Sequence, residues 1–402
     1  MKHLNFYFQL HQPYRLCPSY NFFAMGKNHD YFDDSLNKMI MQRVAQKCYL
    51  PANDMMLQLI KNYDLHISFS CSGVFLEQCQ KWSPEVIESF NKLYATGNVE
   101  FLSETYYHSL SSVFSNQEFG EQIDLHAKLL KKLFNAEASV FRNTELIYND
   151  IIAQEIQKRG YTGILTEGAD KILAWRSPNR LYQPQTCDNL ALLLKNYDLS
   201  DDIAFRFIQN GQPLRLDDYI AKLNNGFLDG NLINIFMDYE TFGEHQSKET
   251  GIFDFFINLI KNLQNKKIQT LTTSQVIKHH NIVAKLQVLD AISWADTNRD
   301  LSPWLGNSLQ DSAMRFAYEL EGAVRQSKDK KIIDDWRKLL ISDHFYYMST
   351  KDKGDGEVHK YFSPFSTPHD AYVVYTNVLN DLSMRLEAEG IYLPDLRFGW
   401  SQ

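Results

Sequence analysis

The stretch NLINIFMDYETFGEH, residues 231–245, joins a nearly continuous apolar run to a group of acidic and aromatic residues. A run of this kind is expected of a strand buried on both faces, as the strands of a parallel sheet are. Asp238 stands at the end of the run. Because a carboxylate beside a core is costly to hold without a partner or a task, this strand end is a candidate for chemistry.

The first two thirds of the chain repeat this pattern, since short apolar runs alternate with segments that carry apolar residues every three or four positions. The alternation predicts an α/β fold with a parallel sheet, which both an open doubly wound sheet and a closed barrel satisfy. Polar residues follow many of the runs, which favours the barrel. The predicted strands cover 4–10, 65–71, 99–103, 139–143, 162–166, 191–194 with 203–207, 231–238 and 268–272, and the predicted helices between them cover 33–62, 84–96, 116–134, 150–159 and 250–265.

After about residue 300 the strand pattern fades, and amphipathic helices are predicted over 309–326, 330–340 and 368–389. We therefore expect a barrel domain over 1–285 and a helical C-terminal domain over 286–402 that contributes to the active-site groove. Loops are predicted over 176–186 and 349–359.

The composition limits the class of protein. Acidic residues outnumber basic ones by 49 to 41, which gives a formal charge of −8 without a basic cluster. Nucleic acid and an anionic membrane surface are therefore not expected as partners. The five cysteines are scattered without CxxC spacing, and no apolar run approaches membrane-spanning length. The first residues read as a strand, not as a signal peptide, so we expect a cytoplasmic protein with reduced thiols.

Two early segments place polar side chains near strand ends. His11 follows the first predicted strand and could exchange hydrogen bonds with a sugar hydroxyl; the alternative is a structural histidine beside Pro13. Glu100 alternates with Val99 and Phe101 and could point into the barrel, with His108 further on; the alternative for Glu100 is a solvated charge at a strand start.

Two later segments carry the carboxylates of greatest interest. Glu145 lies just past a strand, where Arg142 and Tyr148 could hold it ionised as a nucleophile requires, although it could also be an ordinary loop residue. Asp238 lies beside Tyr239, and an acid in such a closed setting would have its pKa raised, which suits a general acid. Since Asp, Glu and His are also metal ligands, the alternative there is a metal site, but no close His or Cys pair supports one.

The segment from Ser293 to Asn307 interleaves Trp294 and Trp304 with acids such as Asp296. Aromatic faces and carboxylates together are typical of a sugar subsite, because a sugar presents both C–H faces and hydroxyl edges. The alternative is a domain junction in which the tryptophans are packing residues.

Taken in order, these segments resemble the five conserved regions of glycoside hydrolase family 57. The matching features are the tripeptide from His11, the Gly-x-x-Glu ending at Glu100, the Glu145 segment, the Asp-x-Glu-x-Phe-Gly from Asp238, and the Asp296 segment. The resemblance spans residues 11 to 307. It implies a (β/α)7 barrel with a C-terminal helical bundle, a retaining mechanism on α-1,4-glucans, and no need of a cofactor or metal.

The resemblance also implies roles for single residues. Glu145 would be the nucleophile and Asp238 the acid/base, while other residues would bind sugar or set the electrostatics. The candidate substrate contacts are His11, Glu100, His108, Arg142, Tyr239, Glu240, His245, Trp294, Asp296 and Trp304.

One position departs from the family pattern, and another bears on the branch within the family. Gln9 replaces a histidine that many members carry two residues before His11, which affects one hydroxyl contact. His245 stands where transferase-type members carry Trp, which favours the α-amylase branch. We therefore expect hydrolysis of starch- or glycogen-type glucans or maltooligosaccharides. The alternatives are a 4-α-glucanotransferase on the same carboxylates, a glucan-binding protein with weak catalysis, and a metal-dependent deacetylase on a similar barrel.

Overall fold

The computed structural model describes residues 1–351 and 363–393. The described chain forms two compact units: the first contains residues 1–12, 39–106 and 122–294, and the second contains 13–38, 107–121 and the residues from 295 onward. The second unit thus takes in two early segments that the expected boundary at residue 285 assigned to the barrel. Most of the predicted loop over 349–359 lies outside the described residues.

The first unit is built on parallel strands that form two sheets. In the first sheet β1 lies in the centre and pairs with both β10 and β2, and β2 pairs with β3. In the second sheet β4 pairs with β5, and β5 with β7. The strands are β1 (His3–Leu10), β2 (Ile67–Cys71), β3 (Val99–Phe101), β4 (Val140–Arg142), β5 (Gly163–Glu167), β7 (Ala191–Lys195) and β10 (Leu232–Asp238).

The two sheets are linked at both edges. Beyond β3, Ser103 N donates to Val140 O at 3.0 Å, and Arg142 N donates to Ser103 O at 2.8 Å. On the other side, Asn196 N after β7 donates to Asn234 O in β10 at 2.9 Å. The parallel strands therefore follow one another in the cyclic order β1, β2, β3, β4, β5, β7, β10, as the predicted barrel requires.

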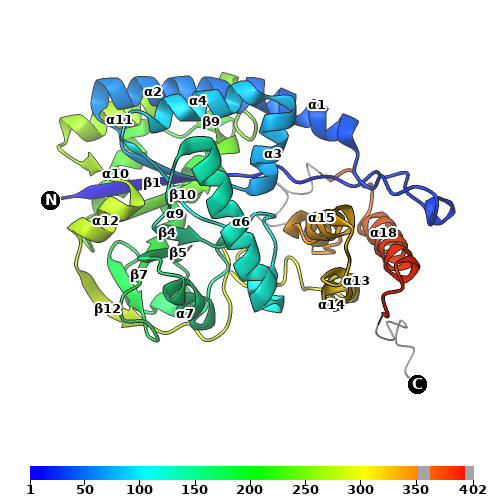
Figure 1. The fold of residues 1–402 in the computed structure, drawn as a ribbon. Helices are drawn as coiled ribbons and strands as arrows, with labels where there is room; N and C mark the ends of the chain where they lie inside the picture. The colour runs from blue at the N-terminus through cyan, green and yellow to red at the C-terminus, as the bar shows by residue number, and fades with distance from the viewer. Residues whose placement is uncertain (352–362, 394–402) are drawn as a thin grey trace. The chain divides into compact units, whose positions relative to one another are not determined.

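Apolar and aromatic side chains fill the space inside these strands. Tyr7 and Phe236 meet edge to face with ring centroids 5.4 Å apart, and Leu193 belongs to the same buried cluster. The interior is thus a packed core, so chemistry has to occur at its end, where strands give way to loops. On the outside, helices α2, α4 and α11 cover the β1 side of the sheet (Figure 1).

Most of the predicted helices are confirmed, and α6 begins and ends at the predicted residues. The helices of the first two thirds are α1 (Asp34–Val44), α2 (Leu50–Tyr63), α3 (Gly73–Trp82), α4 (Pro84–Tyr94), α5 (Ser111–Phe114), α6 (Asn116–Phe134), α7 (Asp150–Lys158), α8 (Asp170–Leu173), α9 (Tyr197–Ala204), α10 (Leu216–Gly226), α11 (Ile252–Asn265) and α12 (Thr273–His279). Among the described residues, no helix is both long and apolar enough to cross a membrane.

Two strand predictions and one loop prediction need correction. The apolar run 203–207 is not a strand, because Asn196 caps α9 and the helix continues to Ala204. The predicted loop 176–186 contains β6 (Leu181–Pro184), which pairs with β7 and with β12 (Ile282–Leu286). The run 268–272 shortens to β11 (Gln269–Thr270), which lies along the start of β1. A small hairpin is added by β8 (Ile208–Gln209) and β9 (Gln212–Pro213).

The second unit is helical, as predicted for the C-terminal region. Glu118, fully buried, binds both Arg325 at 3.0 Å and Arg337 at 2.8 Å. Asp381, also fully buried, accepts hydrogen bonds from Tyr31 and from Gly26 N. The helices are α13 (Ser308–Glu319), α14 (Glu321–Val324), α15 (Lys330–Leu339), α16 (Ser342–Tyr346) and α18 (Pro368–Ala388).

Candidate active site

Asp238 stands at the carboxyl end of β10, in register with Gln9 on β1. Gln9 is buried, and its amide nitrogen lies 3.2 Å from an oxygen of the buried Glu104. The side-chain oxygen of Gln9, Oε1, accepts a 2.6 Å hydrogen bond from the Tyr7 hydroxyl. Polar side chains of β1, β10 and the segment after β3 therefore gather at the end of the barrel where enzymes of this architecture place their functional groups.

The pKa of the buried Tyr7 hydroxyl responds to the charged groups at this end of the barrel. Burial raises its pKa above the ordinary value; Arg142 acts to lower that pKa, whereas Glu104 and Asp238 act to raise it. A charge acts on a hydroxyl the more strongly the nearer it lies. Arg142 at the end of β4, Glu104 after β3 and Asp238 at the end of β10 thus all act on one buried group.

Glu145 sits in the 3-10 turn Thr144–Leu146, directly after β4. Its φ is +56° and that of Leu146 is +51°, so two consecutive residues with side chains adopt the left-handed region. Such conformations are unfavourable for residues other than glycine and persist where the surroundings enforce them, often at functional sites. Here Trp294 encloses the turn: its indole N–H donates to Glu145 Oε2 at 2.7 Å, and its backbone N donates to Glu145 O at 3.1 Å.

Two cations flank the same indole ring. The Arg142 guanidinium carbon lies 5.0 Å from the Trp294 ring centroid, and Lys195 Nζ lies 5.4 Å from a Trp294 ring centroid. Arg142 is fully buried, and its three side-chain nitrogens make no hydrogen bond within the described chain. Lys195 is held at 2.8 Å from Asp201 and 3.5 Å from Glu167. The positive field of these cations favours the ionised form of nearby carboxylates.

The predicted support of Glu145 is therefore partly wrong. Tyr148 does not serve it, because the Tyr148 hydroxyl turns to Asp150 at 3.4 Å. Trp294, which we expected to stack on sugar, instead supplies a hydrogen bond to the carboxylate through its N–H edge. No local pattern links two residues 149 positions apart, so this pair could not be read from the sequence.

Glu240 lies next to Asp238 in a buried setting. Burial and the neighbouring Asp238 carboxylate raise the pKa of Glu240 to about 8, against hydrogen bonds from Tyr49 and from the backbone of His11 that lower it. The Tyr49 hydroxyl donates to Glu240 Oε1 at 2.6 Å. The raised pKa favours the protonated form of Glu240 near neutral pH, which lessens the negative charge beside Asp238.

His11 and Gly243 complete the surroundings of Asp238 and Glu240. His11 Nδ1 lies 2.7 Å from Ser72 Oγ, which fixes the imidazole after β1. Gly243 has a φ of +106°, and a Cβ there would meet Lys47 O at 2.0 Å. The segment from Asp238 thus ends in glycine, because the chain at Gly243 lies too close to the backbone of Lys47 to leave room for a side chain.

Three predicted contacts lie elsewhere in the fold. Glu100 accepts from Ser274 N at the start of α12 and from Ser68, so it caps a helix near the amino ends of the strands. Tyr239 is fully buried, and its hydroxyl donates to Asn53 on α2 at 2.8 Å. Trp304 is buried in the core of the second unit beside Tyr346. None of these positions supports a contact with substrate.

Glu104 is the residue that sequence reasoning missed at this end of the barrel. The period-two pattern already placed Glu100 and Glu104 on one face. Glu104 lies four residues further along, where the carboxyl ends of the strands gather, and it receives a hydrogen bond from Gln9. Position along the strand, not only the face, was the signal that could have identified it.

The remaining candidates are placed but their roles stay predictions. His245 N donates to Glu240 O at 2.9 Å, next to the acid pair. His108 and Asp296 belong to the second unit, with φ values of +50° and +56°, and Asp296 lies 3.3 Å from Lys351 Nζ. Within the described residues, no three His, Cys, Asp or Glu side chains form a group able to hold a metal ion.

Comparisons with known proteins identify the family of the chain. The model of the family described as Glycosyl hydrolase family 57 matches residues 5–288. A protein of Methanocaldococcus jannaschii named "Putative alpha-amylase" is 42% identical over 393 residues, which cover 94% of this chain and 83% of that protein.

Three solved structures share the fold at low sequence identity. A branching enzyme of Thermococcus kodakaraensis has a TM-score of 0.69 at 12% identity, covering 97% of this chain and 91% of that one. An α-amylase of Thermotoga maritima has a TM-score of 0.62 at 13% identity, covering 99% and 96%. A 4-α-glucanotransferase of Thermococcus litoralis has a TM-score of 0.65 at 14% identity. The match covers 86% of this chain but only 56% of that longer protein. The predicted barrel with a helical C-terminal part is thereby confirmed.

Proposed function

Because the chain belongs to glycosyl hydrolase family 57, a family of glycosidases, we propose that it cleaves α-1,4-glucosidic bonds of starch- or glycogen-type glucans or maltooligosaccharides with retention of configuration. The observation that supports this most is the enclosed carboxylate of Glu145, which a strained turn presents and the Trp294 indole orients. Asp238 approaches the same group of residues from β10. Two carboxyl groups from separate strands are the equipment that a retaining glycosidase needs.

In the first step Asp238 gives its proton to the glycosidic oxygen while a Glu145 oxygen attacks the anomeric carbon. The bond to the leaving sugar breaks, and a β-linked glucosyl ester forms on Glu145. The Trp294 N–H donates to Glu145 in the resting enzyme and so holds the attacking carboxylate in a single orientation.

In the second step Asp238 removes a proton from water, and the water oxygen attacks the anomeric carbon. The ester breaks, Glu145 recovers its negative charge, and the sugar leaves with its α configuration. Glu240, which burial and Asp238 keep protonated near neutral pH, avoids charge repulsion when Asp238 is ionised between the two steps.

The relatives support a glucan substrate and hydrolysis. The M. jannaschii relative is named as an α-amylase, and one structural neighbour is an α-amylase. A glucanotransferase would use the same two carboxylates, with a sugar hydroxyl in place of water. Incubation with maltoheptaose separates the two: hydrolysis releases new reducing ends, whereas redistribution of chain lengths without reducing ends would contradict our proposal.

The roles of the two carboxylates are tested by Glu145→Gln and Asp238→Asn. Each variant should lose at least about 10³-fold in kcat on maltoheptaose, because each removes a group that bonds or transfers a proton in the transition state. Glu137→Gln is a matched control, since Glu137 is a largely exposed partner of Lys131. Near-normal turnover in Glu145→Gln or Asp238→Asn, with the control active, would remove the assignment.

We also infer that the protein acts in the cytoplasm. All five cysteines are free thiols, and four of them are buried. Unpaired thiols are the usual state in a reducing compartment. Recovery of the native protein from the culture medium instead of the cell interior would contradict this inference.

A further inference from the structure

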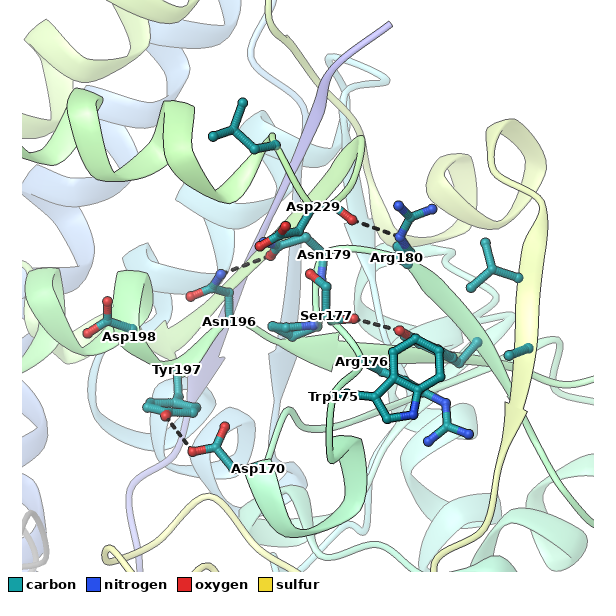
Figure 2. Close-up of a pocket in the computed structure, with 15 residues that line it drawn as sticks. Asp170, Trp175, Arg176, Ser177, Asn179, Arg180, Asn196, Tyr197, Asp198 and Asp229 are labelled. Atoms are coloured by element: carbon teal, nitrogen blue, oxygen red, sulfur yellow. Dashed lines mark hydrogen bonds between the residues drawn. The ribbon is translucent and has the colours of Figure 1, made fainter.

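A cavity of about 690 Å³ lies in the first unit, and the residues grouped around Glu145 and Asp238 do not line it. The segment between α8 and β6 forms one wall of the cavity, and the start of α9 forms another. The loop before β10 and the strand β12 complete the lining. Figure 2 shows Trp175 and Arg180 on one side, Tyr197 and Asp170 on the other, and Asn179 between them.

Trp175 is the most unusual of these residues, because 86% of its surface is exposed. It follows Ala174, whose φ of +53° and ψ of −110° end helix α8 abruptly. The Arg176 guanidinium carbon lies 5.1 Å from a Trp175 ring centroid. An indole exposed beside a cavity offers a flat apolar surface on which a ligand can stack.

Hydrogen bonds within the wall fix polar groups around this ring. The Tyr197 hydroxyl donates to Asp170 at 3.0 Å, and Asn196 Nδ2 donates to Asn179 Oδ1 at 2.8 Å. Arg180 uses Nε to bind Asp229 O at 2.7 Å. The cavity is thus lined by amides, hydroxyls and charges that are already positioned for a polar ligand.

The charges on the wall are mixed. Three carboxylates, of Asp170, Asp198 and Asp229, stand against two guanidinium groups, of Arg176 and Arg180. Neither an anion nor a cation is favoured by such a lining. A neutral ligand with flat C–H faces and many hydroxyls fits both the exposed indole and the polar wall.

We propose that this cavity is a non-catalytic binding site for an α-glucan chain, with Trp175 as its stacking platform. The choice of an α-glucan rests on the proposed function. Asn196 directly follows Lys195, whose ammonium lies beside the Trp294 ring at the candidate active site. A polymer held at the cavity is therefore kept close to the carboxyl end of β7, and a short oligosaccharide gains nothing from it.

The test compares Trp175→Ala and Arg180→Ala with Phe23→Ala. Phe23 is 80% exposed and lies in the other unit, so it controls for the loss of an exposed aromatic ring. Migration in native gels with and without glycogen measures polymer binding, and thermal unfolding confirms that each variant is folded. The rate on glycogen divided by the rate on maltotriose measures the consequence for turnover.

We expect Trp175→Ala to weaken glycogen retardation about tenfold, as loss of a stacking contact of roughly 1.4 kcal/mol would. Arg180→Ala should weaken it less, the glycogen-to-maltotriose rate ratio should fall in parallel, and Phe23→Ala should change neither. Equal retardation of Trp175→Ala, Phe23→Ala and the parent, or no retardation of the parent, would overturn the proposal. Failure of the proposed function would show separately, because the parent protein would then cleave neither glycogen nor maltotriose. Glycogen retardation in the native gel would still measure binding at the cavity.

Discussion

At the residue scale, the hydrogen bond from Trp294 to Glu145 joins the last residue of the first unit to a carboxylate 149 positions earlier in the chain. Charge-assisted hydrogen bonds of this length contribute about 1.5–3 kcal/mol. Trp294→Phe keeps an aromatic ring between Arg142 and Lys195 but removes the donor. We expect kcat on maltoheptaose to fall about 10- to 100-fold.

The pH profile distinguishes this role from simple packing. Without the donor, the ionised nucleophile loses a stabilising contact, so the acid limb of the kcat/KM profile should move to higher pH. Trp82→Phe, on α3, is the control and should leave the profile in place. An unchanged acid limb in Trp294→Phe would show that the indole N–H does not act on the nucleophile.

Glu240 makes a second prediction at this scale. Its pKa in the folded protein, about 8, lies above the ordinary carboxyl value. Its protonated form is therefore favoured by folding, and the associated stability is complete at acid pH and is lost as the pH rises toward and past 8. Glu240→Gln keeps a neutral side chain of similar shape, so the variant does not lose this stability as the pH rises. The variant should gain stability over the parent between pH 5 and pH 9, by a few kcal/mol.

Urea unfolding at pH 5, 7 and 9 measures this difference. Glu244→Gln is the comparison, since Glu244 is paired with Arg43 at 2.7 Å and should be destabilised by the change. If the free-energy difference between Glu240→Gln and the parent were the same at all three pH values, Glu240 would not titrate with a raised pKa.

Sequence reasoning at the residue scale named candidate carboxylates but not the partners that the structure gives them. Glu145 and Asp238 could be named because each follows an apolar run. Glu104, by contrast, shows its importance only when Gln9 on another strand lies beside it. Tyr239 looked like a groove residue, but it faces α2 because successive strand residues alternate between the barrel interior and the helix layer.

At the element scale, the turn Thr144–Leu146 stores strain at Glu145. A left-handed conformation costs a residue with a side chain roughly 1–2 kcal/mol, whereas glycine adopts it readily. Glu145→Gly should therefore be more stable to urea than Glu145→Ala, by about 1 kcal/mol, although both are inactive. Equal or lower stability of the glycine variant would show that the turn is not strained at this position.

Glu118 on α6 makes a prediction about the second unit. Its carboxylate is fully buried and binds both Arg325 and Arg337, so Glu118→Ala removes the buried partner of two guanidinium groups and leaves them the more exposed carboxylate of Glu121. We expect a loss of about 3–5 kcal/mol in the free energy of unfolding. Glu319→Ala removes a more exposed carboxylate 3.9 Å from Arg315 and should cost less than about 1 kcal/mol. Similar losses in the two variants would contradict the structural role of Glu118.

Element prediction succeeded where the local signals agreed with one another. The helix over residues 116–134 was predicted correctly because its apolar period and its acidic first turn agree. The run 203–207 was misassigned because its apolar residues match a strand, while capping of α9 by Asn196 keeps the chain helical through Ala204. The strand Leu181–Pro184 was missed because two prolines nearby indicate a loop, and only pairing with β7 and β12 reveals it.

At the scale of the whole molecule, alternating runs and polar strand ends predicted a barrel, and the structural comparisons confirm it. The division of the chain was less predictable. Residues 13–38 and 107–121 belong to the compact helical unit through contacts with residues from 295 onward. Such long-range contacts leave no local pattern, since a loop between strands and a segment of another unit have similar compositions.

The central claim is that Glu145 becomes covalently bonded to the anomeric carbon. Its most direct test is to trap that ester with a 5-fluoro-α-glucosyl fluoride, which forms the intermediate but slows its hydrolysis, and to map the label by peptide mass spectrometry. We expect one sugar on the peptide that contains Glu145, and none in Glu145→Gln. A label on another carboxylate, or turnover of maltoheptaose with inversion at the anomeric carbon, would contradict it.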